Sequence, residues 1–594
     1  MKRRALAALT LAAALLSGCA SSPSSSAPSA PAPETSAVSG GEGSATGGGT
    51  EGTTAGTSVS SSSGGPVSSS SSSSSSSLSS SPSSSATSGR PGAFRALSPL
   101  SGQEADTASP SFQWSSAGEG ARYTLTLEIY KDGGFRRVET AENLTGTSWR
   151  PSSPLNDNTI YRWRVEASLG GTSRPAGGMQ GGQIVFMSKR DYKTHPANIG
   201  RDYAFDGKIT EAVLENYLDR AMILSWLDCP SPLAGDDKRM ILNTGAKYIG
   251  RSCIPWQMGD WEYARMIQFK QDIAALHAED PDIIVEACIF ETTWTSIEKM
   301  AIPAYVFEAF GQPVQNRCFD YEAMLYPDGR YINHWGEGGS VPDITRLETQ
   351  MWFYYRSCEF IKAGFEGLHY GQVLLMGEND RSSGYACWKK VLDLTRAFAK
   401  QNARRHMVLI NAHTSGMKDS SGHLFFDFHS FPLRLRTPAG STAHAPTEQN
   451  PQVTVIQKGW HDSLYGKSLG GITPSGFVTD SSPYFVELDN YGGTQTGGAP
   501  SNRPGIDFFP WGYDEISWFA NQPASYRAEW LASTRDAIRA LDPKGHLEMP
   551  GSRPAWLNSS GSMGWYYANS TLFTSYGFGD EEAIRSAFIR DNQR

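Results

Sequence analysis

The alternation of two kinds of segment over residues 191–594 constrains the fold of this chain most strongly. Short apolar runs of strand length recur there, and longer amphipathic stretches of helix length separate them. This alternation predicts an α/β domain with a parallel sheet, because parallel neighbours need a long crossover connection. The predicted strands are residues 221–226, 247–253, 283–290, 367–372, 407–411, 424–428, 484–488 and 506–509.

Four connecting segments have clear helical character: residues 261–277, with Asp260 as the expected N-cap, and residues 344–363, 385–402 and 523–541. Eight strand units of this kind predict a TIM (β/α)8 barrel, and a doubly wound open sheet is the alternative. No glycine-rich phosphate-binding motif follows any predicted strand. We therefore predict no nucleotide cofactor, and no other cofactor.

Residues 93–190 show a different pattern. Apolar and polar residues alternate with a period of two over residues 123–130 and 161–167, and shorter strands are expected at 111–114 and 183–187. Clusters of Gly, Pro, Asn and Asp separate these runs, as in a small β-sandwich. The chain is therefore predicted to be multidomain, with a β-sandwich followed by the α/β barrel.

This segment resembles a bacterial fibronectin type III or immunoglobulin-like module. The resemblance rests on Trp114 in an early strand, Tyr123 at the start of a middle strand, and the run from Leu155 to Val165. The segment contains no cysteine, so the disulfide of antibody domains is absent and the fibronectin type III variant is favoured. The resemblance implies that these aromatic side chains form the core of a spacer module.

Residues 1–19 have the features of an export signal. Basic residues 2–4 precede an apolar segment, residues 5–16, which is too short to span a bilayer as a stable helix. The following Leu-Ser-Gly-Cys sequence resembles the lipobox of bacterial lipoproteins. The resemblance implies cleavage before Cys19, acylation of that residue, and anchoring to the outer face of the bacterial membrane. The alternative is an ordinary secretory signal in which Cys19 has no such role.

Residues 20–92 consist almost entirely of Ser, Gly, Thr, Ala and Pro, with an unbroken serine run at 68–77. A segment with so few apolar side chains cannot bury enough surface to offset the entropy lost on ordering. We therefore predict a disordered tether between the leader and the folded domains.

Charge and cysteine content narrow the class of partner. The net charge of −8 disfavours nucleic acid as a partner, since nucleic-acid-binding domains carry a basic patch or stripe. The six cysteines other than Cys19 all lie between residues 229 and 387. In an exported protein they allow disulfides, and buried free thiols are the alternative.

Active sites of barrels lie at the carboxyl ends of the strands. The residues that end or follow the predicted strands are carboxylates, amides, imidazoles and indoles. This mixture suits a poly- or oligosaccharide, because polar groups bind hydroxyls and aromatic rings stack on the apolar faces of sugars. The candidate substrate-binding residues are Trp256, Trp294, His369, Gln372, Asn411, His413, His429, Asp489 and Trp511.

Hydrolysis of a glycosidic bond needs two carboxyl groups, and the candidates are Glu291, Glu378 and Glu487. The domain resembles TIM-barrel glycoside hydrolases that place an acid after strand four and a nucleophile after strand seven. Glu487 matches the second position, within Phe-Val-Glu-Leu-Asp-Asn. The Asn-Glu pair expected at strand four is replaced by Gly371-Gln372. Glu378 or Glu291 would then supply the acid.

Two alternatives remain open. A barrel with the same rim but no productive carboxyl pair would bind glycans at the cell surface without cleaving them. A metal-dependent hydrolase would use His369, His413 and His429 with Asp228 or Asp427. The His-x-His that metal-dependent amidohydrolases carry at strand one is Ser-Trp-Leu-Asp here, so no metal site is predicted. No Gly-x-Ser-x-Gly elbow supports a serine hydrolase.

Overall fold

The computed structural model describes residues 89–101, 104–105, 109–131, 134–156, 159–178, 182–187, 195–227, 234–256, 260–433, 468–488 and 514–593. The predicted leader, Cys19 and residues 20–88 of the predicted tether lie outside this set. Residues 89–92, also assigned to the tether, contact the β module, since the Gly92 amide donates to the Ala117 carbonyl at 2.6 Å. No helix in the described residues has both the length and the apolar character needed to cross a bilayer.

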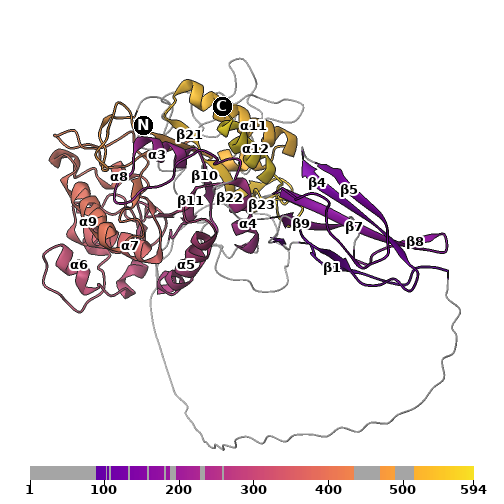
Figure 1. Ribbon diagram of the computed structural model, residues 1–594. Helices are drawn as coiled ribbons and strands as arrows, with labels where there is room; N and C mark the ends of the chain where they lie inside the picture. Colours follow the sequence, from indigo (N-terminus) through magenta and orange to yellow (C-terminus); the bar gives the residue numbers. More distant parts are fainter. Residues whose placement is uncertain are drawn as a thin grey trace, which may run out of the picture. The chain divides into compact units, whose positions relative to one another are not determined.

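The N-terminal module consists of two sheets (Figure 1). The small sheet has the order β1-β3-β6, and the large sheet has the order β2-β9-β7-β4-β5, with β8 paired to β7. The bounds are β1 (Ala96–Ser98), β2 (Glu104–Ala105), β3 (Phe112–Trp114), β4 (Arg122–Lys131), β5 (Gly134–Leu144), β6 (Ser148–Trp149), β7 (Thr159–Leu169), β8 (Thr172–Pro175) and β9 (Gln183–Met187).

The two sheets share one core. Tyr123, Leu125 and Leu127 of β4 are buried because alternate side chains of a strand point to the same face. Trp114 and Trp163 lie in the same cluster, which confirms that these aromatic residues are core. The predicted strands at 111–114, 123–130, 161–167 and 183–187 correspond to β3, β4, β7 and β9. Strand β5 was not predicted, because its largely exposed Arg- and Glu-rich sequence lacks the alternation.

In the α/β domain, a seven-stranded sheet has the order β16-β15-β12-β11-β10-β22-β23. All neighbours are parallel except β22 and β23, which form an antiparallel hairpin. The bounds are β10 (Ala221–Leu224), β11 (Tyr248–Cys253), β12 (Ile284–Cys288), β15 (Gly367–His369), β16 (Leu409–Asn411), β22 (Met549–Leu557) and β23 (Ser562–Tyr567).

A second parallel sheet contains β17 (His429–Pro432), β20 (Tyr484–Glu487) and β21 (Gly545–Leu547). The two sheets are connected at two places. The amides of Asp427 and Ser430 donate to the carbonyls of Ile410 in β16 and of Ala412 after it, at 2.9 and 3.1 Å. On the other side, β21 continues through Glu548 into β22, and the Glu548 amide donates to the Val486 carbonyl at 2.9 Å.

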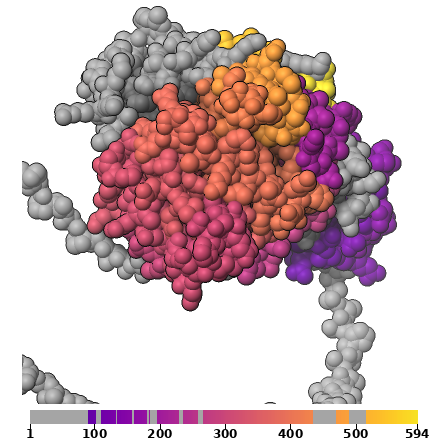
Figure 2. All heavy atoms as spheres, turned by 90° about the vertical axis from the view of Figure 1, so that its left-hand side faces the viewer, coloured from indigo at the N-terminus to yellow at the C-terminus, as the bar shows by residue number. Residues whose placement is uncertain are grey.

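Helices connect most of the parallel strands (Figure 1). The four predicted helices correspond to α5, α7, α9 and α11. Helices α6, α7 and α9 lie on the left-hand side of Figure 1, which is the side that faces the viewer in Figure 2. The bounds are α3 (Glu211–Leu218), α4 (Ala234–Thr244), α5 (Asp260–Glu279), α6 (Ala304–Ala309), α7 (Leu347–Ala363), α8 (Val373–Met376), α9 (Ala386–Asn402), α10 (Glu515–Ala520), α11 (Ala524–Leu541) and α12 (Glu581–Asn592).

One predicted strand is wrong, and another lies outside the described residues. The apolar run at 424–428 is a buried loop rather than a strand, and β17 begins only at His429. The predicted strand 506–509 lies outside the described residues, and the second neighbour of β10 is the unpredicted β22. Strand β22 was not predicted, because it contains Pro550, Gly551 and Pro554, and these residue types favour turns. Gly551 is needed there, since a Cβ would lie 2.8 Å from the Ile223 carbonyl oxygen.

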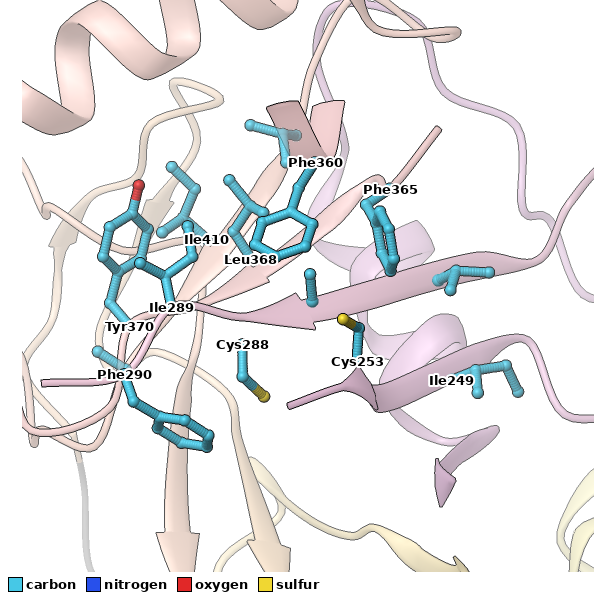
Figure 3. Close-up of a cluster of buried hydrophobic side chains, with 14 of the residues drawn as sticks. Ile249, Cys253, Cys288, Ile289, Phe290, Phe360, Phe365, Leu368, Tyr370 and Ile410 are labelled. Carbon is cyan, nitrogen blue, oxygen red and sulfur yellow. The ribbon is translucent and has the colours of Figure 1, made fainter. Parts of the chain in front are cut away.

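The apolar core of the α/β domain lies between strands and helices. In Figure 3, Leu368 of β15 lies beside Phe360 of α7, and Ile249 and Cys253 of β11 lie on the other side of β12. Among the described cysteines, the following are free thiols: Cys253, Cys288, Cys318, Cys358 and Cys387. Burial raises the pKa of the Cys358 thiol, and Cys253 and Cys288 are also buried, so these three side chains act as apolar core residues.

Candidate active site

Polar side chains converge where the parallel strands end. Glu487 is the last residue of β20, Asn411 the last of β16 and His369 the last of β15. The register pairs His369 with Asn411, so these two side chains belong to neighbouring strands at one level. The interior of a barrel-like sheet is usually filled by branched apolar residues, so a polar layer at this level indicates a functional site.

Glu487 lies at the centre of an ion-pair cluster. Its Oε1 accepts from the guanidinium of Arg251 and lies 2.8 Å from Nε2 of His413. Arg251 Nη2 lies 2.8 Å from the same His413 nitrogen. Glu487 is fully buried, whereas the His413 side chain is 17% exposed, so the cluster reaches solvent through the imidazole.

The backbone conformation at Arg251 places its side chain beside Glu487. Its φ angle is 48°, in the left-handed region that non-glycine residues rarely adopt, and the β11–β12 register shifts between Ile249 and Cys253. Its amide donates to Glu286 Oε2 at 3.0 Å, which holds this conformation. Backbone strain of this kind costs about 1–3 kcal/mol and concentrates at functional sites. Arg251 was not among the predicted site residues.

Glu286 organises the layer beneath this ion pair. Its Oε1 accepts from the Tyr248 hydroxyl at 2.6 Å and from the Asn411 amide, and burial raises its pKa. Asn411 Oδ1 in turn contacts His369 Nδ1 at 2.6 Å and accepts from the Ser430 hydroxyl at 2.8 Å. Asn411 is completely buried, so the structure places this predicted substrate-binding residue in the supporting network.

A third carboxyl group, Glu548, belongs to the same cluster. It follows β21 and its side chain lies against Gly250, where a Cβ would overlap Oε1 and lie 3.5 Å from Glu286 Oε2. Burial, followed by the nearby charge of Glu487, raises the pKa of Glu548 well above its usual range. Both effects favour the neutral form of Glu548. It was not predicted, because it stands in a short His-Leu-Glu-Met sequence that resembles no strand end.

Glu291 lies near the backbone of His413. Both of its carboxylate oxygens accept from Gln372, one from the backbone amide and one from the side-chain amide, each at 2.9 Å. Gly371 connects the two carboxylates, because its Cα lies against Glu291 Oε2 and its carbonyl accepts from the His413 amide at 2.8 Å. The structure thus brings together four of the predicted residues: Glu291, Gln372, His413 and Glu487.

Replacing Gly371 by alanine tests this connection. The new Cβ would overlap Glu291 Oε2 at a φ of 65°, so the carboxylate must move. We expect a loss of about 1–2 kcal/mol in the free energy of unfolding and loss of any activity that depends on Glu291. Gly384→Ala is the control, because Gly384 has a φ of 72° and no neighbour within 4 Å. Equal behaviour of the two variants in denaturation and activity assays would contradict the role of Gly371.

Aromatic rings border the carboxylates. Trp256 packs edge-to-face on Trp335 at 4.8 Å and lies 5.3 Å from Phe290, which in turn packs on His369 at 5.7 Å. Trp335 was not predicted, and its indole N–H donates to the Glu291 carbonyl at 3.0 Å. The predicted Trp294 forms β13 (Thr293–Trp294), and its ring lies directly under Gly339. Trp511 lies outside the described residues.

Glu378 is held away from these groups. Its side chain is 42% exposed, pairs with Arg330 at 3.2 Å and accepts from the Tyr331 hydroxyl at 2.9 Å. Neighbouring Asp380 caps a helix. It accepts from the backbone amides of Cys387 and Trp388 at the start of α9, each at 3.0 Å.

Removing this cap gives a stability prediction. Asp380→Ala should lower the free energy of unfolding by about 1–2 kcal/mol, because two amides at the helix start lose their acceptor. Asp393→Ala is the control, since Asp393 is an exposed residue of α9 that pairs with Lys389. Chemical denaturation of both variants measures the difference. Equal stability of the two variants would contradict the capping role.

His429 does not belong to the site. It is the first residue of β17 rather than a residue beyond a strand end, and it is completely buried between Phe426 and Phe431. Asp489 lies outside the described residues. Of the histidines in the metal hypothesis, His369 and His413 pack on each other at 4.7 Å, and His369 Nδ1 is bound to Asn411. No group of three or more His, Cys, Asp or Glu in the described part of the chain could hold a metal ion.

No protein-family model matches the sequence, and no curated protein is similar to it. The debranching enzyme of Nostoc punctiforme aligns with 64% of this chain and 81% of its own, at 11% identity and a TM-score of 0.29. The α-galactosidase of Thermus thermophilus in complex with stachyose aligns with 43% of this chain and 52% of its own, at 10% identity and a TM-score of 0.20. The β-D-glucuronidase of Dictyoglomus thermophilum aligns with 85% of this chain and 68% of its own, at 10% identity and a TM-score of 0.24. The likeness to glycoside hydrolases is thus weak.

Proposed function

We propose that this protein is a glycoside hydrolase, anchored at the bacterial cell surface, that uses Glu291 and Glu487 as its two carboxyl groups. The strand order and the hydrogen bonds between the two sheets support a (β/α)8 barrel, in which β21 and β22 together form the eighth strand. The N-terminal module would act as a fibronectin type III spacer. Residues 20–88 would form the tether.

One observation carries the proposal: two buried carboxylates lie close to one partly exposed histidine. Glu487 contacts the His413 ring, and Glu291 lies against Gly371, whose carbonyl accepts from the His413 amide. Two carboxyl groups close to one accessible point are what hydrolysis of a glycosidic bond requires. The nearby rings of Trp256, Trp335 and Phe290 are buried and pack on one another, so they support the site from behind.

The neighbours of the two carboxyl groups favour a different catalytic role for each. The guanidinium of Arg251 favours the ionised form of Glu487, which suits a nucleophile or base. Glu291 would then protonate the leaving oxygen, with Gln372 orienting the carboxyl group. His413, in contact with Glu487, would bind a substrate hydroxyl beside it.

The test is release of reducing ends by the full chain from a panel of neutral and acidic polysaccharides. We expect release by the wild type, abolished in Glu487→Gln and Glu291→Gln and unchanged in Glu308→Gln, which alters an exposed residue of α6. Absence of release by the wild type from every polysaccharide would contradict the hydrolase. Full activity of either site variant would contradict the role of that residue.

A non-catalytic glycan-binding protein is the second candidate. One observation favours it: both carboxylate oxygens of Glu291 accept hydrogen bonds from Gln372. A general acid must carry a proton on one of these oxygens, and these bonds favour the ionised form instead. Retardation of the wild type in gels that contain a polysaccharide, without release of reducing ends, would identify this function.

Surface anchoring is tested separately. Acylated Cys19 should bring the protein into the detergent phase when a cell extract is partitioned with a nonionic detergent. Cys19→Ser should move it to the aqueous phase, whereas Ser17→Ala should not. A wild-type protein that stays in the aqueous phase would contradict lipid anchoring and leave an ordinary secretory signal.

A further inference from the structure

The protonation of His369 is fixed by its neighbours. Glu286 already accepts from Tyr248 and from the Arg251 amide, so it presents acceptor oxygens to Asn411. The Asn411 amide group therefore faces Glu286, and its carbonyl oxygen faces His369 Nδ1 at 2.6 Å. His369 must carry its proton on Nδ1 to make this bond, so Nε2 has a lone pair and can only accept.

His369 Nε2 is an acceptor without a donor. The residue is 1% exposed, and the described atoms offer this nitrogen no hydrogen-bond partner. Its ring packs edge-to-face on the partly exposed His413 at 4.7 Å and on Phe290 at 5.7 Å. Buried acceptors in native proteins nearly always have a donor, so this nitrogen points to a ligand group that carries an O–H or N–H.

The charge around this nitrogen indicates which ligands are excluded. Two buried glutamates each lie one residue away from His369: Glu286 through Asn411, and Glu487 through His413. The guanidinium of Arg251 already binds Glu487 and His413. The pKa of His369 lies well below its usual range because of burial, followed by the charge of Arg251. A carboxylate or sulfate ligand would meet further negative charge and could donate nothing to His369.

We propose that the site takes an uncharged sugar ring and that His369 Nε2 accepts a hydrogen bond from one of its hydroxyls, reached past the His413 ring. A hydroxyl fits because it donates and carries no charge, whereas a uronate or a sulfated sugar has neither advantage at this point. This inference rests on the carbohydrate-binding part of the proposed function, and it does not require that the sugar be cleaved.

Binding to matched polysaccharides tests the inference. The full chain is run in native gels that contain a soluble α-glucan, a β-glucan or a galactomannan, each beside its counterpart with the C6 hydroxymethyl groups oxidised to carboxylates. We expect retardation by at least one neutral polymer and at least tenfold weaker binding to its oxidised form. Equal or stronger binding to an oxidised polymer, or retardation by none of the six, would overturn the proposal.

The role of His369 is tested by His369→Phe, which keeps an aromatic ring but removes the acceptor. We expect at least tenfold weaker binding of the neutral polymer by a variant that remains folded, with a somewhat lower melting temperature because the Nδ1–H bond to Asn411 is lost. His423→Phe, at a largely exposed histidine, is the control. Wild-type affinity in His369→Phe would overturn the assignment of this residue. Since reducing-end release is measured separately, binding without release refutes only the hydrolase.

Discussion

Replacing Arg251 by methionine is expected to lower the release of reducing ends by about 10³-fold, the effect of removing one preorganised charged or polar partner from an active site. Arg251 contacts the proposed nucleophile Glu487 directly and lies 2.8 Å from His413. Without the guanidinium, burial favours the neutral form of Glu487, which cannot act as a nucleophile or base. The measurement is the rate of release as a function of pH.

Arg251→Lys separates charge from geometry. Lysine keeps the positive charge but not the planar fork of donors, so we expect it to retain part of the activity that methionine removes. Thermal unfolding of both variants checks that they remain folded, because removing one partner of a buried ion pair also costs about 3–5 kcal/mol. A folded Arg251→Met variant with wild-type activity at every pH would contradict the proposed role of the Arg251–Glu487 pair.

The sequence predicted elements whose residues have one buried side. Strand β4 was found because Tyr123, Leu125 and Leu127 alternate with more exposed residues, and α9 because its apolar residues recur with helical spacing. Strand β22 was missed because its Pro and Gly residues are typical of turns. The 424–428 run was misassigned because burial of a loop by tertiary contacts produces the same apolar pattern as a buried strand.

The site was predicted where its residues follow a strand and missed where they lie within one. Glu291, Gln372 and His413 lie beyond strand ends, and the rule for barrels finds them. Arg251 is inside β11, and only its strained backbone shows that it serves Glu487. The side chain of Glu548 occupies the space that Gly250 leaves by lacking a Cβ. These two residues are far apart in the sequence, so a local sequence pattern cannot show that they are in contact.

His429→Phe is expected to make the protein less sensitive to acid. Burial lowers the pKa of His429 to about 3, against 6.5 in the unfolded chain. Below pH 6.5 the unfolded state therefore binds a proton that the folded state does not, and stability falls as pH falls from 6.5 towards 3. Between pH 7 and pH 5 this histidine alone should cost the wild type about 2 kcal/mol of unfolding free energy.

The variant should lose about 2 kcal/mol less than the wild type over this interval, as measured by chemical denaturation at both pH values. Buried His195, whose pKa is also lowered to about 3, and His369 remain in the variant, so part of the acid sensitivity should persist. His429→Phe should also be more stable than the wild type at pH 7, because neither ring nitrogen of His429 has a hydrogen-bond partner among the described residues. The exposed-site variant His423→Phe should show the wild-type pH dependence. A wild-type pH dependence in His429→Phe would contradict this prediction. It would mean that His429 is protonated in the folded state near its ordinary pKa, despite its apolar surroundings in β17.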